Sequence, residues 1–173
     1  MNVPNVFDVN LPDWDLGFTP LGHAILSAAP SVVEELLNSG SDVKIMTKAS
    51  RDAPAFHPLT LTVLTKDQNI AYKIAESLIA AEASCSTATD GSARTIFYHA
   101  VASGRTDFVS SFLRSDPNSN AALNFPALTC HPSAMYAVVV PVASGNYSML
   151  ALLLANGVQL NPPEDAIFQA KTI

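Results

Sequence analysis

The chain has 173 residues, the length of one domain, and 14% of them are charged while 49% are hydrophobic. The formal net charge of −6 argues against nucleic acid or an anionic membrane as partner, because both demand clustered Lys and Arg. No apolar run approaches the ~20 residues of a membrane span, and Met1 is not followed by the basic start of a signal peptide. With only two cysteines, these features predict an intracellular protein, cytoplasmic or nuclear.

The first predicted element is a pair of helices that begins at Thr19-Pro20. Threonine caps the first turn of a helix well, and proline sits there without losing a backbone hydrogen bond. Apolar residues at helical spacing then predict helices over 20–28 and 30–38. Gly40 can end the second helix, because glycine enters the left-handed conformation at low cost.

Three further helix pairs are predicted along the chain, each aligned on an anchor equivalent to Thr19. The anchors are His57, Thr95 and Tyr136, at successive spacings of 38, 38 and 41 residues. The second pair is expected to contain about four residues more than the first pair. These additional residues are expected between its helices, around 66–69. The predicted helices cover 58–65 and 70–81, 96–103 and 106–114, and 136–143 and 146–155.

Particular residues in these pairs carry their own expectations. His57 takes the place of a capping threonine, which leaves the cap of that helix in question. Pro141 should kink or shorten the seventh predicted helix, because it removes a backbone hydrogen bond. Cys85 falls at a position expected to be buried. The predicted core includes one leucine from the second helix of each pair: Leu37, Leu78, Leu113 and Leu153.

The segment from Thr19-Pro20-Leu21 to Gly40-Ser41-Asp42-Val43 resembles an ankyrin repeat, whose mark is Thr-Pro-Leu-His-x-Ala, two helices and Gly-Ala-Asp-Val-Asn. The resemblance implies an all-α solenoid of stacked helix-turn-helix units joined by long hairpin-like connectors. Such units must stack, because each is too small to bury its own apolar face. The chain would form a single domain over 1–173, with repeats at about 13–44, 52–86, 90–118 and 131–161. Residues 162–173 would be a partial repeat or a cap.

In the ankyrin family, partners usually bind the concave side, formed by connector tips and first helices. The residues just before the four anchors give an aromatic-rich row of the kind favoured at binding hot spots: Phe18, Phe56, Arg94 and Met135. The other transferred positions are Asp15, Leu16, Leu26 and Ser27; Ala53, Pro54, Leu64 and Thr65; Gly91, Ser92, Ala102 and Ser103; and Pro132, Ser133, Ala143 and Ser144.

Trp14 is a further candidate contact residue. It replaces the turn aspartate of the family and should therefore lack that residue's hydrogen bonds, and it is expected at the surface. Two alternatives stay open. Phe18 and Phe56 could fold back against the connectors instead of facing a partner, and Trp14 could shield the open end of the first unit.

No feature of the sequence supports an enzyme. His23 and His99 share one repeated position and are expected to pack structurally. The chain lacks a Cys/His set with zinc spacing, a Gly-x-Ser-x-Gly elbow and a glycine-rich phosphate loop, so no catalytic residue, metal, cofactor or small-molecule substrate is expected.

The predicted function is a protein–protein interaction scaffold that binds a peptide or a folded protein through its concave face. One alternative is a structural or regulatory spacer packed against other domains of a larger protein. Another is the non-catalytic accessory domain of an enzyme. The identity of a partner does not follow from the fold, because unrelated functions share it.

Overall fold

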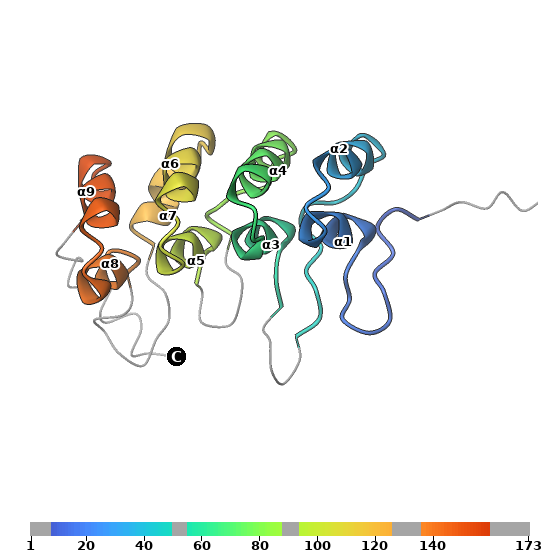
Figure 1. Cartoon of the computed structure of the whole chain (residues 1–173), viewed down its shortest axis with the longest axis horizontal. Coiled ribbons are helices and arrows are strands. Elements are labelled where there is room, and N and C mark those ends of the chain that lie inside the picture. Colours follow the sequence, from blue (N-terminus) through green and yellow to red (C-terminus); the bar gives the residue numbers. More distant parts are fainter. Residues whose placement is uncertain (1–7, 50–54, 88–93, 126–135, 160–173) are drawn as a thin grey trace, which may run out of the picture. The chain divides into compact units, whose positions relative to one another are not determined.

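The computed structural model describes residues 8–49, 55–87, 94–125 and 136–159, which form nine helices and no strand (Figure 1). The all-α prediction is therefore confirmed for the described part of the chain. The helices are α1 (Pro20–Leu26), α2 (Pro30–Asn38), α3 (Pro58–Leu64), α4 (Gln68–Ala80), α5 (Ile96–Ala102), α6 (Thr106–Ser115), α7 (Ser119–Leu123), α8 (Val139–Ser144) and α9 (Tyr147–Ala155).

The chain divides into two compact units, Met1–Glu82 and Ala83–Ile173. In the first unit, α1 packs against α2 and α3, and α2 packs against α4. In the second unit, α5 packs against α6 and α8, α6 packs against α9, and the short α7 contacts both α5 and α6. Each unit thus contains two helix pairs, with first helix beside first helix and second beside second (Figure 1).

The eight helices expected from the sequence are all present within a few residues of their predicted bounds. The position of the extra residues in the second pair was predicted wrongly. α3 ends at Leu64 and α4 begins at Gln68, so the turn between them has the same length as the turn between α1 and α2. The additional residues instead lengthen α4, which has 13 residues against 9 in α2. The side chain of Asp67 fixes the start of α4 by accepting hydrogen bonds from the N–H groups of Asn69 and Ile70.

The predicted cap at Thr19 is confirmed, and Thr95 caps its helix in the same way. Thr19 Oγ1 accepts a hydrogen bond from the N–H of Gly22 at 3.2 Å, and Thr95 Oγ1 accepts one from Tyr98 at 3.1 Å. His57 has a buried side chain and makes no capping hydrogen bond at the start of α3. The first turn of α3 is thus held by burial of its apolar residues instead of by a polar cap.

Two features of the second unit depart from regular pairs. α8 has six residues and begins at Val139, three residues later than predicted, with Pro141 in its first turn. This shortening is the effect that proline was expected to have. α7 lies in a segment expected to be a connector, where Ala122 and Leu123 are 1% and 2% exposed. Its five residues are too few to show a helical period in the sequence.

The core of the second unit is formed largely by aromatic residues of α6. Phe108 and Phe112 are fully buried, and their rings meet edge to face with centroids 5.8 Å apart. Leu113 follows Phe112 by about 100° around the helix and is only half-buried. The prediction that placed Leu113 in the core was therefore wrong.

Of the three other leucines predicted in the core, two are fully buried and one is not. Leu78 and Leu153 are fully buried, as predicted. Leu37 is half-buried, because it lines an open depression between α2 and α4 instead of the interior. In α2 the fully buried residue is Val33. Cys85 is completely buried, as expected, and burial raises the pKa of its thiol, with the nearby Asp116 carboxylate adding to the effect.

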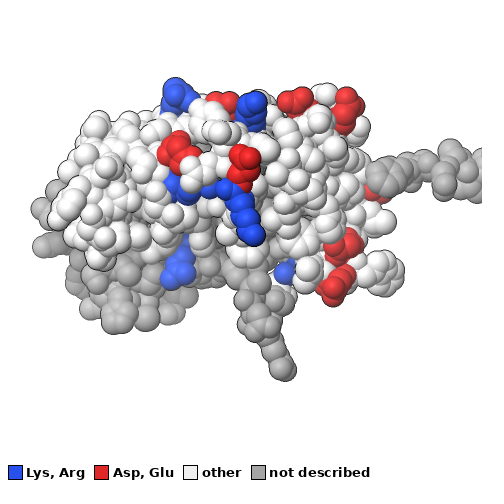
Figure 2. Space-filling view, viewed as in Figure 1, with Lys and Arg blue, Asp and Glu red and all other residues white. Residues whose placement is uncertain are grey.

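α9 differs from the other second helices in its composition. Its sequence, YSMLALLLA, contains no charged residue, and α8 contains none either. On the face shown in Figure 2, the surface over α9 accordingly carries no Lys, Arg, Asp or Glu. By contrast, α2 exposes both Glu34 and Glu35.

We predict that Phe112→Ala lowers the free energy of unfolding by about 3–5 kcal/mol, the usual cost of truncating a buried phenylalanine. Leu113→Ala, the adjacent control, should cost about 1 kcal/mol or less, because only part of its side chain is removed from water. Denaturant titration followed by circular dichroism measures both. Equal losses in the two variants would show that α6 presents a different face to the core.

The turns after α2, α4 and α9 each contain a residue in the left-handed conformation. Gly40 fills this position after α2 with φ 87°, and Glu82 fills it after α4 with φ 67°. A residue with a Cβ atom is strained in this region, at a cost of about 1–2 kcal/mol. The turn after α4 therefore carries backbone strain that the turn after α2 avoids.

We predict that Glu82→Gly raises the free energy of unfolding by about 0.5–1 kcal/mol, since release of strain exceeds the extra entropy of glycine in the unfolded chain. Glu82→Ala removes the same charge but keeps the strain, so it should give no such gain. Gly40→Ala should lower stability, although a Cβ there would meet no atom within 4 Å. Thermal melts of the three variants test this, and a gain in the alanine variant of Glu82 would assign the effect to charge.

Candidate functional site

The candidate site begins with the loop of residues 8–18 that precedes α1, here called the first loop. Its centre is Asp13, whose Oδ1 accepts hydrogen bonds from the N–H groups of Leu16 (2.9 Å) and Gly17 (2.8 Å). Oδ2 of Asp13 lies 2.8 Å from Nε2 of His23 in α1, and the N–H of Asp13 donates to the carbonyl of Phe18. One carboxylate thus closes the loop and ties it to the first helix.

This finding corrects the assignment of the turn position. Sequence comparison placed Trp14 where the family has its turn aspartate and expected the hydrogen bonds of that residue to be lost. In the structure Asp13, one residue earlier, makes hydrogen bonds within the turn. The side chain of Trp14 is therefore not needed to close the turn.

A second set of contacts joins the first loop to the following connector through Lys48. The N–H of Lys48 donates to the carbonyl of Leu16, and its Nζ donates to the carbonyl of Trp14, both at 2.9 Å. Gly17 makes this approach possible, because a Cβ at Gly17 would lie 2.7 Å from Cγ of Lys48. Gly17 also has φ 71°, which favours glycine on its own. The loop is therefore held from both sides.

The pKa of the Asp13 carboxyl is consistent with its role in closing the first loop. Partial removal from water on its own would raise the pKa of the Asp13 carboxyl, but the hydrogen bonds from Gly17, His23 and Leu16 outweigh it and lower the pKa below the ordinary value. Asp13 is consequently ionised at neutral pH, when it is the best acceptor for these donors.

The first loop presents three large apolar side chains to solvent. Trp14 is 97% exposed, Leu11 is 66% exposed and Leu16 is 51% exposed, and the neighbouring Asp15 is exposed as well. Such exposure is inconsistent with the alternative in which Trp14 shields the open end of the first unit. Hydrogen bonds hold the backbone of this loop while its apolar side chains remain uncovered.

The residues just before the anchors lie in less open environments. Phe18 is half-buried, with its ring 5.3 Å from that of His23 and close to the Cα of Gly22. Phe56 is also half-buried, and its backbone exchanges hydrogen bonds with Thr47. Part of the surface of each phenylalanine is therefore covered by neighbouring residues of the chain.

Arg94, in the second unit, is half-buried, and its guanidinium lies 5.6 Å from the centre of the Tyr98 ring. Met135 lies outside the described residues, as do the transferred positions Ala53, Pro54, Gly91, Ser92, Pro132 and Ser133. The structure therefore does not test the predicted row as a whole.

Of the two transferred positions at the end of each first helix, the first is exposed in all four pairs, whereas Thr65, the second position of the second pair, is buried and was wrongly placed at the surface. Leu26 is 44% exposed and Leu64 is 55% exposed, while Ala102 and Ala143 stand at the same position in their pairs and are exposed too. In the first unit the ends of α1 and α3 are neighbours, since Thr65 Oγ1 lies 3.5 Å from the carbonyl oxygen of Ile25. Leu26 and Leu64 therefore belong to adjacent helix ends, and we call them the apolar ridge.

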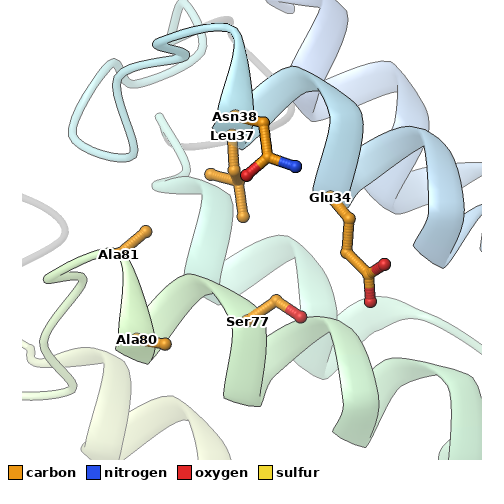
Figure 3. A pocket seen from close by; sticks show the side chains of 6 residues that line it. All are labelled: Glu34, Leu37, Asn38, Ser77, Ala80 and Ala81. Carbon is orange, nitrogen blue, oxygen red and sulfur yellow. The ribbon is translucent and has the colours of Figure 1, made fainter.

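An open depression of about 470 Å³ lies between α2 and α4 on the first unit (Figure 3). Small side chains line it from α4, and Glu34 is its one ionisable group. It lacks the convergent polar groups that fix a ligand or activate a nucleophile. Its lining residues are Glu34, Leu37, Asn38, Ser77, Ala80 and Ala81.

Two further features concern only the described part of the chain. Within it, no group of three or more His, Cys, Asp or Glu side chains is placed to hold a metal ion. None of the described helices has the length and apolar character that crossing a membrane requires.

No protein-family model matches this chain, and no curated protein matches it. Family membership therefore stays a proposal that depends on the residues and helix pairs of the chain itself.

We predict that the first loop loosens in acid. The pKa of the Asp13 carboxyl is lower in the folded chain than in the unfolded chain, where it is ~3.9. The ionised carboxylate therefore stabilises the loop at pH values above ~3.9. That stabilisation is lost as pH falls through the folded-state pKa. Trp14 is the only tryptophan, so its fluorescence anisotropy reports on this loop alone. The anisotropy should stay constant from neutral pH down to mild acid and then fall.

Asp13→Ala should show low anisotropy already at neutral pH, whereas Asp15→Ala, an exposed neighbour, should behave like the parent chain. Circular dichroism recorded in parallel separates loosening of the loop from unfolding of the helices. If the anisotropy of Asp13→Ala equals that of the parent chain at neutral pH, the carboxylate does not hold the loop.

Proposed function

We propose that the chain is an ankyrin-type repeat array that binds a protein partner, and that the first loop and the apolar ridge form its contact surface. Repetition supports the first part of this proposal. The described residues form four helix pairs with short turns, and within each unit the pairs stack first helix on first helix. An exposed apolar surface is suited to binding other macromolecules.

A repeated asparagine contact also supports an array. The side chain of Asn10 donates to the carbonyl of Gly40 and accepts from the N–H of Asp42. In the second unit, Asn124 makes the same two contacts, with the carbonyl of Gly157 and the N–H of Gln159. Each asparagine binds the turn that follows a second helix about 30 residues later in the chain. The same pair of asparagine contacts thus occurs once within each unit.

The observation that carries the binding proposal is the exposure of Trp14 on a hydrogen-bonded loop. Tryptophan is enriched among the residues that dominate binding energy at interfaces. A loop already held by Asp13 and Lys48 loses little conformational entropy when a partner covers it, which favours affinity. The loop therefore combines a large apolar side chain with the rigidity that recognition rewards.

The charges around Trp14 indicate the chemistry of the partner. Asp8 and Asp15 are both exposed on the first loop, and Lys48 is engaged with the loop backbone. Charged groups at the edge of an interface steer association and select partners with the opposite charge. We therefore propose a partner with an apolar pocket for the indole ring, bordered by Lys or Arg.

The spacer alternative assigns the same apolar positions to contacts with other parts of a larger protein. It differs in its consequence for the isolated chain, which would then have no ligand of its own. The exposure of Leu26 and Leu64 is compatible with both proposals, so a binding measurement is needed to separate them.

We predict that a peptide or protein selected by display against the 173-residue chain loses about 10- to 30-fold in affinity for Trp14→Ala, which corresponds to ~1.5–2 kcal/mol. The fold should be unaffected, because 97% of the Trp14 surface is in solvent. Isothermal titration calorimetry with each variant provides the measurement. Leu64→Ala should weaken binding to a smaller degree.

Glu34→Ala is the matched control, since Glu34 is exposed on α2 and distant in sequence from the first loop. Unchanged affinity for Trp14→Ala, together with a loss for Glu34→Ala, would move the interface to the second helices. If repeated selections against the folded chain yield no ligand, the spacer alternative is favoured.

A further inference from the structure

α9 has two apolar sides although only one of them is buried. Met149 and Leu153 are fully buried on the first side. The second side follows the helical spacing i, i+3, i+4 and i+7, and Tyr147 at its start is 81% exposed. A helix that is apolar all round is normally buried on all sides. The residues of the second side therefore have the composition of an interface: Tyr147, Leu150, Ala151 and Leu154.

α8 exposes an apolar residue at a position that is buried in the three other helix pairs. Val142, six residues after the anchor Tyr136, is 58% exposed. The residues six positions after the other three anchors are 0%, 7% and 2% exposed: Ile25, Val63 and Val101.

α9 shows the same difference fourteen residues after the anchor, where Leu150 is only half-buried. The equivalent residues of α2, α4 and α6 are all 0% exposed: Val33, Ala71 and Val109. Among the described residues, the last pair alone thus lacks a cover at both positions. We give the name terminal face to Val142, Tyr147, Leu150, Ala151 and Leu154.

We propose that the terminal face is a self-association site, at which two copies of the chain meet across a twofold axis with α9 antiparallel to its symmetry mate. The occupant is thus the terminal face of a second copy. This contact is independent of the partner proposed for the first loop.

Charge favours a second copy at this face. In a twofold contact, residues near the axis meet their own copies, so any charge there opposes itself. The chain has a net charge of −6, and α2 exposes Glu34 and Glu35. From residue 117 to residue 163, by contrast, the sequence contains no Lys, Arg, Asp or Glu, and this range includes all of α8 and α9. Two copies can therefore meet at the terminal face without opposing like charges and without burying a carboxylate.

The shape of the stripe on α9 also suits an antiparallel copy. Its spacing is the same when read in either direction, so an antiparallel mate presents Leu154 to Tyr147 and Ala151 to Leu150. The small side chain of Ala151 leaves room for the larger Leu150 of the other copy, as interdigitated helix packing requires. The phenolic hydroxyl of Tyr147, at the end of the stripe, keeps access to water.

The size of the face sets the strength of the dimer. α8 has six residues and α9 has nine, so the contact belongs to the small end of specific interfaces. We therefore expect a weak dimer that dissociates at low micromolar concentration.

The test is sedimentation velocity of the 173-residue chain from low micromolar into the millimolar range. The mass should rise from that of one chain, 18.3 kDa, to twice that value and stay there. A mass of one chain over the whole range would overturn the proposal. Growth beyond two copies would also overturn it, because open-ended assembly indicates a head-to-tail contact instead of a twofold one.

A pair of double variants locates the contact. Tyr147→Glu with Leu154→Glu places like charges against each other in the dimer and should raise its Kd more than about 100-fold. Val32→Glu with Leu64→Glu adds the same charge at residues that are 49% and 55% exposed on the first unit, and should dimerise like the parent chain. Circular dichroism checks that all helices remain. Equal weakening in both double variants, or none in the first, contradicts a contact at the terminal face.

An isotope-filtered NOE experiment on a mixture of labelled and unlabelled chains needs no substitution. Within one helix Tyr147 and Leu154 are about 10 Å apart, too far for an NOE. Cross-peaks between the Tyr147 ring of one copy and the Leu154 methyl groups of the other are therefore expected only for the antiparallel dimer. A dimer that lacks these cross-peaks would place the contact on another surface and overturn the proposal.

Discussion

The structure depends on one constraint, which is that a single helix pair cannot bury its own apolar residues. In α4, the residues Ala71, Ile74, Ala75 and Leu78 are all fully buried, and this helix packs against both α3 and α2. In α3, every residue from Pro58 to Val63 is buried between α1 and α4. Burial of this extent requires a neighbouring pair, so the helices are stable only as a stack.

Stacking also determines how the first loop is presented. The loop precedes α1, but Lys48, which binds its backbone, belongs to the connector that leads to α3. The exposed position of Trp14 therefore depends on the contact between α1 and α3 as well as on Asp13. A loss of stacking would remove the second of these two supports, so folding of the unit and display of the indole ring are coupled.

The helices could be predicted from the sequence because their signals are local. The Thr19-Pro20 start, apolar periodicity and a terminal glycine act within one or two turns, and such signals located the eight paired helices. Features that depend on tertiary contacts were missed: the burial of Phe112 in place of Leu113, and the role of Asp13. Sequence spacing alone cannot show which of Asp13 and Trp14 closes the turn, because Gly17 and Lys48 decide it through a contact between distant segments. The exposure of Trp14 was predicted, whereas the sequence left open whether Phe18 faces a partner or packs against the connectors.

The first and last helix pairs differ in the polarity of the residues that they expose. α2 carries two exposed carboxylates, Glu35 and Glu34, of which Glu34 lines the depression between α2 and α4. α9 has no charged residue at the equivalent place and exposes Tyr147 and Leu154 instead. An uncovered apolar helix face lowers solubility and favours association, and α9 has no charged side chain to offset this. The last pair therefore has the kind of surface that an internal member of a stack presents to its neighbour.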